Sequence, residues 1–164
     1  MTSSLSKRFA AWVLLAAVTT VPAKASADAP TSYPPGLGVG TYLGIGPGGF
    51  GFYALSLKKW LGRTQAVDGA VGAYFDEFYS HVDYKRRLRE LRLRGMPVSL
   101  DLGAGVSTFV GDRTWVGLRG TLGASRLFPG RRPREVFIEF TPTFFVTPER
   151  IVEAALGFGG RVYF

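Results

Sequence analysis

A two-residue alternation of apolar and polar side chains recurs along most of this chain and limits how it can fold. In residues 151–164, one set of alternate positions carries no charge, while the other holds both charged residues, Glu153 and Arg161. Successive side chains of a β-strand point to opposite faces, so a repeat of two predicts a strand with two unlike faces. The chain is therefore expected to be all-β.

Turn-forming residues divide this alternation into eight expected strands. Their approximate ranges are residues 38–46, 50–61, 66–75, 78–85, 96–109, 114–128, 135–146 and 151–164. Strands of about ten residues are long enough to cross a membrane at a tilt. The spacing predicts one domain over residues 37–164, an eight-stranded antiparallel up-and-down transmembrane β-barrel.

Three details of this expected barrel are specific enough to check. Gly111, Asp112 and Arg113 have the composition of a hairpin turn. The basic stretch at residues 85–95 is expected to be a connector, with at most one helical turn near its middle. Pro142 lies inside the seventh strand, where it removes a donor from the ladder, so a bulge is expected there.

The first 27 residues have the order of a secretory signal peptide. Lys7 and Arg8 precede an apolar run at residues 9–18, and the small residues 25–27 follow. This order predicts cleavage before Asp28, and the apolar run is too short for a membrane helix. Residues 28–36 are then a short lead-in to the barrel.

Composition narrows the possible functions. The chain has no cysteine, which excludes disulfides, thiolate metal sites and a cysteine nucleophile. Its net charge of +8 would suit nucleic acid or an anionic membrane surface, and export favours the membrane. The 22 glycines among 164 residues are roughly twice the average usage, as expected where interior space is short. We expect no cofactor and no nucleic-acid partner.

Two orientations of the strand faces compete. A soluble periplasmic lipid-binding barrel would turn its apolar face inward, and a membrane barrel would turn it toward lipid. The charged face is sparse and rich in glycine and serine, which favours the membrane barrel. Aromatic residues near the expected strand ends also favour it, because they resemble interfacial girdles. The residues expected in these girdles are Trp60, Phe109, Trp115, Phe128 and Phe164.

The charged face would then line the barrel interior. An eight-stranded barrel is just wide enough for side chains, and buried charges must pair, so we predict a salt-bridged interior with no open pore. Arg119 and Arg161 are its expected centres, because a guanidinium offers five donors. The expected interior charge network is Lys58, Asp68, His81, Asp83, Asp101, Arg119, Glu135, Glu139, Glu153 and Arg161.

The end of the chain resembles the C-terminal signal that the outer-membrane barrel-assembly machinery reads. Gly159, Val162 and Phe164 carry this likeness. Residues 46–60, 66–70, 81–84 and 136–142 resemble an uncharacterised family of small bacterial outer-membrane barrels, similar to the OmpA membrane domain. The resemblance implies the outer membrane of a Gram-negative-type bacterium, with its lipids and the assembly machinery as partners. It implies no known activity.

His81 is the only histidine and the centre of the main alternative function. A lipid A hydrolase or acyltransferase would use it as a base beside a serine. Ser80 points to the opposite face, so only an interior serine at position 99, 107 or 125 would serve, if the strand register allowed it. The competing interpretation is an interior histidine in the charge network. We expect a structural or interaction role, with no catalytic residue and no metal site.

The basic stretches form a second group of candidate residues. They offer sites for an anionic lipid or polymer, or they are solvated turn charge. Counting strands back from the C-terminus predicts that they face the periplasm. The residues concerned are Arg86, Arg87, Arg89, Arg92, Arg94, Arg131, Arg132 and Arg134.

Overall fold

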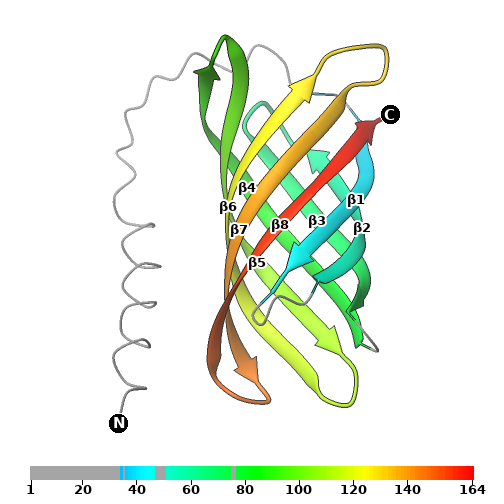
Figure 1. Ribbon diagram of the computed structural model, residues 1–164, viewed down its shortest axis with the longest axis vertical. Coiled ribbons are helices and arrows are strands. Elements are labelled where there is room, and N and C mark those ends of the chain that lie inside the picture. The colour runs from blue at the N-terminus through cyan, green and yellow to red at the C-terminus, as the bar shows by residue number, and fades with distance from the viewer. Residues whose placement is uncertain (1–33, 35, 47–50, 75–76) are drawn as a thin grey trace.

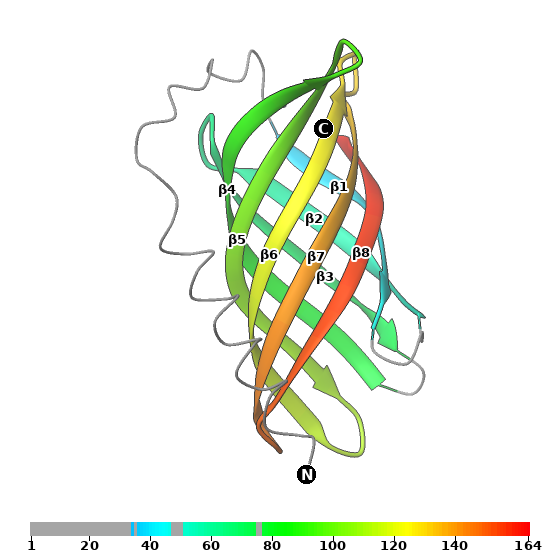
Figure 2. The same cartoon turned by 60° about the vertical axis from the view of Figure 1, so that its left-hand side comes forward.

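The computed structural model describes residue 34 and residues 36–46, 51–74 and 77–164. The expected signal peptide and most of the lead-in lie outside the described residues. Eight antiparallel strands form a closed barrel in sequence order, with β1 pairing β8 (Figures 1 and 2). The strands are β1 (Leu37–Ile45), β2 (Gly51–Trp60), β3 (Gln65–Tyr74), β4 (Glu77–Leu93), β5 (Met96–Val110), β6 (Thr114–Phe128), β7 (Arg134–Thr147) and β8 (Ile151–Tyr163). The predicted all-β, eight-stranded antiparallel barrel is confirmed.

The largest difference from the sequence prediction lies in β4. It continues through the basic stretch to Leu93, so the predicted connector and helical turn are wrong. Residues beyond position 85 keep pairing with β5, which satisfies their backbone groups. The connection is Arg94 and Gly95, whose φ angles are 51° and 79°. Positive φ at both central residues is what a tight type I′ hairpin requires.

Within the described strands the register shifts at two places, and neither lies where Pro142 predicted a bulge. The register shifts between Arg87 and Arg89 in β4, and between Val116 and Gly117 in β6. Pro142 pairs with Ala154 of β8 without any shift. The expected turn at residues 111–113 does join β5 to β6.

Side chains on the two faces of the barrel differ in kind. The outward positions are mainly large and apolar, as shown by Leu118 at 59 % exposed and Ile138 at 54 %. The inward positions hold nearly all the buried charged side chains, together with serine, threonine and tyrosine. A water-soluble barrel would have the reverse arrangement. Among the described residues, no helix is long and apolar enough to cross a membrane.

Inward glycines make room for the large side chains of the interior. A Cβ at Gly157 would lie 2.1 Å from the hydroxyl of Tyr42, and one at Gly44 would lie 2.1 Å from the ring of Phe52. Real side chains do not approach this closely, so each ring needs a glycine on the neighbouring strand. This explains much of the glycine excess.

The connections β2–β3, β4–β5 and β6–β7 lie at one end of the barrel, together with the start of β1 and the end of β8 (Figure 1). We call this the basic end, because exposed arginine and lysine side chains surround it. The opposite end carries the β5–β6 and β7–β8 connections, and we call it the cup end.

Candidate functional site

A compensated set of buried charges fills the middle of the barrel. In the described part of the chain, five buried cations face five buried carboxylates. The cations are Lys58, Lys85, Arg87, Arg119 and Arg161, and the carboxylates are Asp68, Asp83, Asp101, Glu135 and Glu139. Isolated charges in such a place are costly, and matched pairs offset that cost.

Arg119, on β6, organises the part of the network nearest the cup end. Its Nε donates to Asp83 at 2.9 Å, and its Nη1 donates to the hydroxyl of Tyr79 at 2.9 Å. Its Nη2 lies 3.4 Å from the hydroxyl of Tyr42 and 3.5 Å from Glu139. Every nitrogen of this guanidinium therefore has a partner.

Arg161, on β8, occupies the centre. Its Nη2 lies 2.6 Å from Asp68, an ion pair whose N–H is not aligned for a hydrogen bond. Its Nε donates to Ser56 at 2.8 Å and its Nη1 to Glu135 at 3.2 Å. Lys85 adds a second cation 3.4 Å from Asp68 and pairs with Glu139. Arg119 and Arg161 thus hold the central places that the sequence predicted.

The network is closed toward the basic end by aromatic side chains. Lys58 lies 2.9 Å from Glu135 and 3.6 Å from Asp101. The ring of Trp60 packs beneath two cations, with Lys58 Nζ at 4.6 Å and the Arg87 guanidinium at 4.4 Å from its centre. The indole N–H of Trp60 donates to the Tyr163 hydroxyl at 3.3 Å. Trp60 and Tyr163 thus fill the barrel at this end, and we call this pair the stopper.

Lys85 and Arg87 are the network residues that the sequence analysis missed. Lys85 ended the fourth expected strand but was left out of the expected interior network, whereas Arg87 was assigned to a connector and proposed to meet an anionic partner. That assignment is wrong, because Arg87 is buried and lies 3.4 Å from Asp101. A signal was present in the sequence, since the expected network held three cations against six carboxylates. Glu153 lies apart from the other predicted residues, half-buried near the cup end.

The expected aromatic girdle is only partly present. Phe128 and Phe164 face outward, at 38 % and 66 % exposed. Trp60, Phe109 and Trp115 instead share the inward face of their strands, so their assignment to the girdle is wrong. The reason is parity, because Trp60 is two residues from Lys58 and must share its face.

His81 lies inside the barrel, 3 % exposed. Its Nδ1 is 2.8 Å from the Tyr79 hydroxyl, and its Nε2 is 3.5 Å from Asp68. The register places Ser107 directly opposite His81, but the Ser107 hydroxyl has no hydrogen-bond partner in the described structure. Ser80 faces away and bonds Thr108. His81 and Ser107 are therefore neighbours across β4 and β5, but no hydrogen bond joins them in the described structure.

The other two interior serines do not approach His81 as register partners. Ser99 and Ser125 are paired with each other across β5 and β6, nearer the basic end. The hydroxyl of Ser125 donates to Asp101 at 3.3 Å. Ser107 is thus the serine that an acyl-transfer chemistry at His81 would require.

One group of side chains has the composition of a metal site. Asp68, His81 and Asp83 bring ligand atoms within 4.8 Å of one another. Both carboxylates are already engaged by buried cations, Asp68 by Arg161 and Lys85, and Asp83 by Arg119. A divalent ion would add two positive charges to a balanced interior, so the arrangement favours ion pairing over metal binding.

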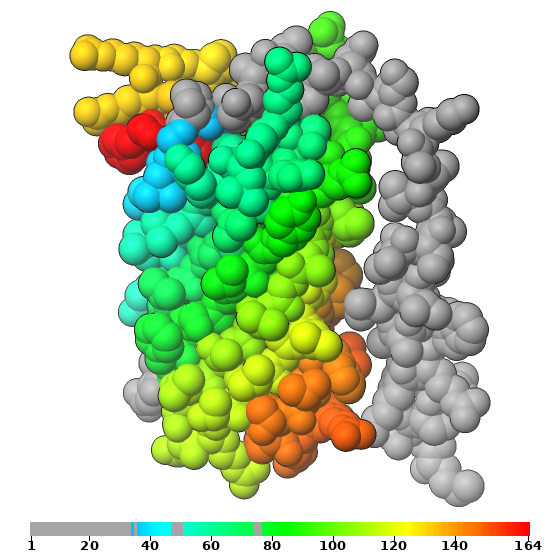
Figure 3. Space-filling model, turned by 180° about the vertical axis from the view of Figure 1, so that it is seen from behind, coloured from blue at the N-terminus to red at the C-terminus, as the bar shows by residue number. Residues whose placement is uncertain are grey.

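Exposed basic side chains ring the basic end. Those with exposed side chains are Lys59, Arg63, Arg86, Arg89, Arg92, Arg94, Arg131, Arg132 and Arg134. Figure 3 shows the side chains of the β6–β7 connection (yellow) extending from this end beside the end of the chain (red). Arg132 lies over the ring of Phe164 at 5.3 Å, and Arg126 over Phe128 at 4.5 Å. The charge of the barrel surface is therefore unevenly distributed.

The residues of the expected assembly signal lie on β8 and directly after it. Gly159 faces inward, where a Cβ would lie 2.6 Å from the Phe137 ring. Val162 lies between two buried residues and so faces outward, and Phe164 is exposed. Comparisons with protein-family models, curated proteins and solved structures found no match for this chain.

Proposed function

We propose that this chain is a small integral outer-membrane β-barrel with a structural or interaction role. The observation that carries the proposal is the combination of an apolar outer face with a charged, fully paired interior. An apolar outer face is stable in contact with lipid. In water the same face would cause the barrels to associate with one another. The signal peptide over residues 1–27, the assembly signal and the likeness to the OmpA membrane domain belong to the same proposal.

The filled interior favours this role over transport. Ion pairs link β2, β3, β4, β5, β6, β7 and β8 across the middle of the barrel, and the stopper of Trp60 and Tyr163 closes one end. A soluble lipid binder, the competing function, would need an apolar cavity behind a polar surface. Here the polar groups occupy the cavity position.

Under this proposal, the basic end faces the periplasm and lies among anionic phospholipid head groups. Arginines at a membrane surface each contribute about 1 kcal/mol of attraction to anionic lipid. Arg126 and Arg132 lie over outward aromatic rings. This pairing of a cation with an outward aromatic ring supports an interface at that level of the barrel. The apolar bands of the strands then lie between the two ends.

Gel mobility tests membrane insertion. The detergent-extracted protein is expected to migrate differently before and after boiling, because a folded membrane barrel resists unfolding by the detergent. N-terminal sequencing of the same sample should start at Asp28. A protein that stays soluble without detergent and shows no mobility shift would favour the soluble lipid binder.

Lipid selectivity tests the role of the basic end. Spin-labelled phosphatidylglycerol is expected to contact the reconstituted barrel more than labelled phosphatidylcholine does. Replacing Arg131, Arg132 and Arg134 by glutamine should reduce that preference. The matched control replaces Arg113 and Arg150, which lie at the cup end. Equal effects of the two sets of substitutions would contradict a specific role for the basic end.

A further inference from the structure

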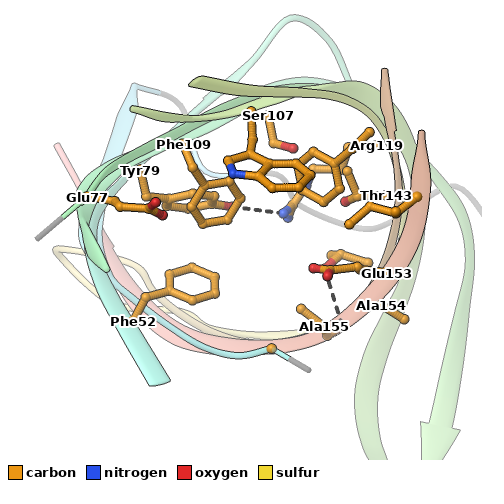
Figure 4. A pocket seen from close by; sticks show the side chains of 15 residues that line it. Phe52, Glu77, Tyr79, Ser107, Phe109, Arg119, Thr143, Glu153, Ala154 and Ala155 are labelled. Atoms are coloured by element: carbon orange, nitrogen blue, oxygen red, sulfur yellow. Dashed lines mark hydrogen bonds between the residues drawn. The ribbon is translucent and has the colours of Figure 1, made fainter. Parts of the chain in front are cut away.

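The barrel interior opens at the cup end into a small cavity, which we call the cup. It encloses about 210 Å³ and is lined by residues from several strands, with the first residues of β4 and β8 at its edge. The charge network forms its floor, where Arg119 is visible in Figure 4. Pockets for drug-sized ligands have volumes of roughly 300–1,000 Å³, so the cup would hold only a small molecule.

Aromatic rings form the wall of the cup. Phe52, Tyr79 and Phe109 are in contact, with ring centres 4.5 Å apart for the first two and 4.8 Å for the last two. Phe145 continues the series at 5.9 Å from Phe109, and Trp115 lies edge-on to Phe145 at 5.6 Å. Five rings from five strands thus surround one space, and their π-faces carry negative potential.

The charge in the cup is negative. Glu77 and Glu153 lie on opposite sides of it (Figure 4), and neither forms an ion pair within the described part of the chain. Arg119 on the floor is neutralised by Asp83 and Glu139. Two carboxylates of the cup therefore remain without a cation.

An unused polar atom also lies in the cup. The hydroxyl of Ser107 lines the cavity, is buried, and has no hydrogen-bond partner in the described structure. A buried hydroxyl without a partner is costly, and a ligand group that accepts or donates a hydrogen bond would remove that cost.

We propose that the cup binds a small organic cation of the quaternary ammonium or alkylammonium class. A hydroxyl group on this cation would strengthen its binding. The aromatic wall supplies cation–π attraction and the two carboxylates supply the opposite charge. Ser107 would bond the ligand's hydroxyl. The proposal holds whether or not the barrel lies in a membrane; if it does, the cup faces the cell exterior.

Choline is the probe that tests this site, and 3,3-dimethyl-1-butanol is its uncharged analogue of the same shape. The folded protein in detergent micelles, labelled with ¹⁵N, is titrated with each compound and followed by NMR through its indole N–H signals. Trp115 lines the cup, and Trp60 lies in the stopper at the other end. Choline is expected to shift the Trp115 signal saturably, to leave the Trp60 signal in place, and to bind at least tenfold more tightly than the alcohol.

Substitutions identify the groups responsible. Trp115→Ala is expected to weaken choline binding roughly five- to thirtyfold, and Trp115→Phe should retain most of the affinity. Because both variants lack the Trp115 indole, their binding is measured from the NMR signals of choline. Glu77→Gln and Glu153→Gln should each weaken it about two- to fivefold, since both carboxylates are partly exposed. Glu149→Gln is the matched control, because Glu149 lies at the same end outside the cup and pairs with Arg113. It should leave binding unchanged.

Three results would overturn the proposal. Equal affinities for choline and the alcohol would show that the cup binds its ligand through apolar contacts alone. Tighter binding of 3,3-dimethylbutanoate, the anionic analogue, would show that Arg119 dominates. An unmoved Trp115 signal would show that the cup is empty of ligand. The membrane proposal is tested separately by gel mobility, so its failure can be told apart from these results. If Trp115→Ala does not fold, the Glu77→Gln and Glu153→Gln variants test whether the cup binds choline.

Discussion

Replacing Arg161 by methionine tests whether the buried charges are coupled. Methionine keeps a long unbranched chain against the ring of Phe137, which the guanidinium overlies at 3.9 Å. It removes the ion pairs to Asp68 and Glu135. Four buried cations would then face five carboxylates, so one negative charge would be left without compensation.

The expected cost follows from what each partner retains. Glu135 keeps Lys58 at 2.9 Å and the Tyr163 hydroxyl at 2.7 Å. Asp68 keeps only Lys85 at 3.4 Å and His81, and it accepts no well-aligned hydrogen bond. Breaking a buried pair by removing one partner costs about 3–5 kcal/mol, and most of that should arise at Asp68.

Urea unfolding of the barrel in lipid vesicles, followed by tryptophan fluorescence, measures the loss. Adding Asp68→Asn to Arg161→Met restores the charge balance, so the double variant should recover about 1–3 kcal/mol relative to the sum of the single losses. Arg150→Met is the control for an exposed arginine at the cup end and should change stability by less than about 0.5 kcal/mol. Strictly additive losses in the double variant would refute the coupled network.

Three further outcomes are expected. Gly157→Val should destabilise the barrel by about 1–3 kcal/mol, because the valine Cβ would lie 2.1 Å from the Tyr42 hydroxyl. Gly62→Ala is the control and should be nearly neutral, because the space around Gly62 is open. Equal unfolding midpoints for the two variants would contradict the role of Gly157 in packing. His81→Ala should leave the lipid A profile of the host membrane unchanged, and an altered profile would revive the enzyme with Ser107 as its nucleophile. Trypsin added to intact cells should not cut at Arg94 in the β4–β5 turn, and cleavage there would reverse the proposed orientation.

Most of the secondary structure could be read from the sequence, because side-chain direction alternates with a fixed period in a strand. Seven of the eight strands begin and end within about two residues of their expected ranges, a margin normal for element boundaries. The inward residues also follow from parity. The same rule would have placed Trp60, Phe109 and Trp115 inside, had it been applied to aromatic residues as strictly as to charged ones.

The basic stretch shows where local patterns become ambiguous. A run of arginines looks like a solvated turn, and only pairing with β5 shows that it is a strand. The bulge between Arg87 and Arg89 then changes the parity, so Arg87 points inward and Arg89 outward. The charge imbalance of the expected network was the one sequence signal that more cations had to be inside.

Alternation along the chain was enough to predict most of the strand boundaries, the two faces of each strand and the need for buried charges to pair. Which charges meet depends on how the strands are placed around the closed barrel. Arg161 and Asp68 lie on β8 and β3, which are not neighbours, so their contact depends on the closure and stagger of the whole barrel. The cup has the same origin, because its five rings come from five strands and face one another only once the sheet has closed.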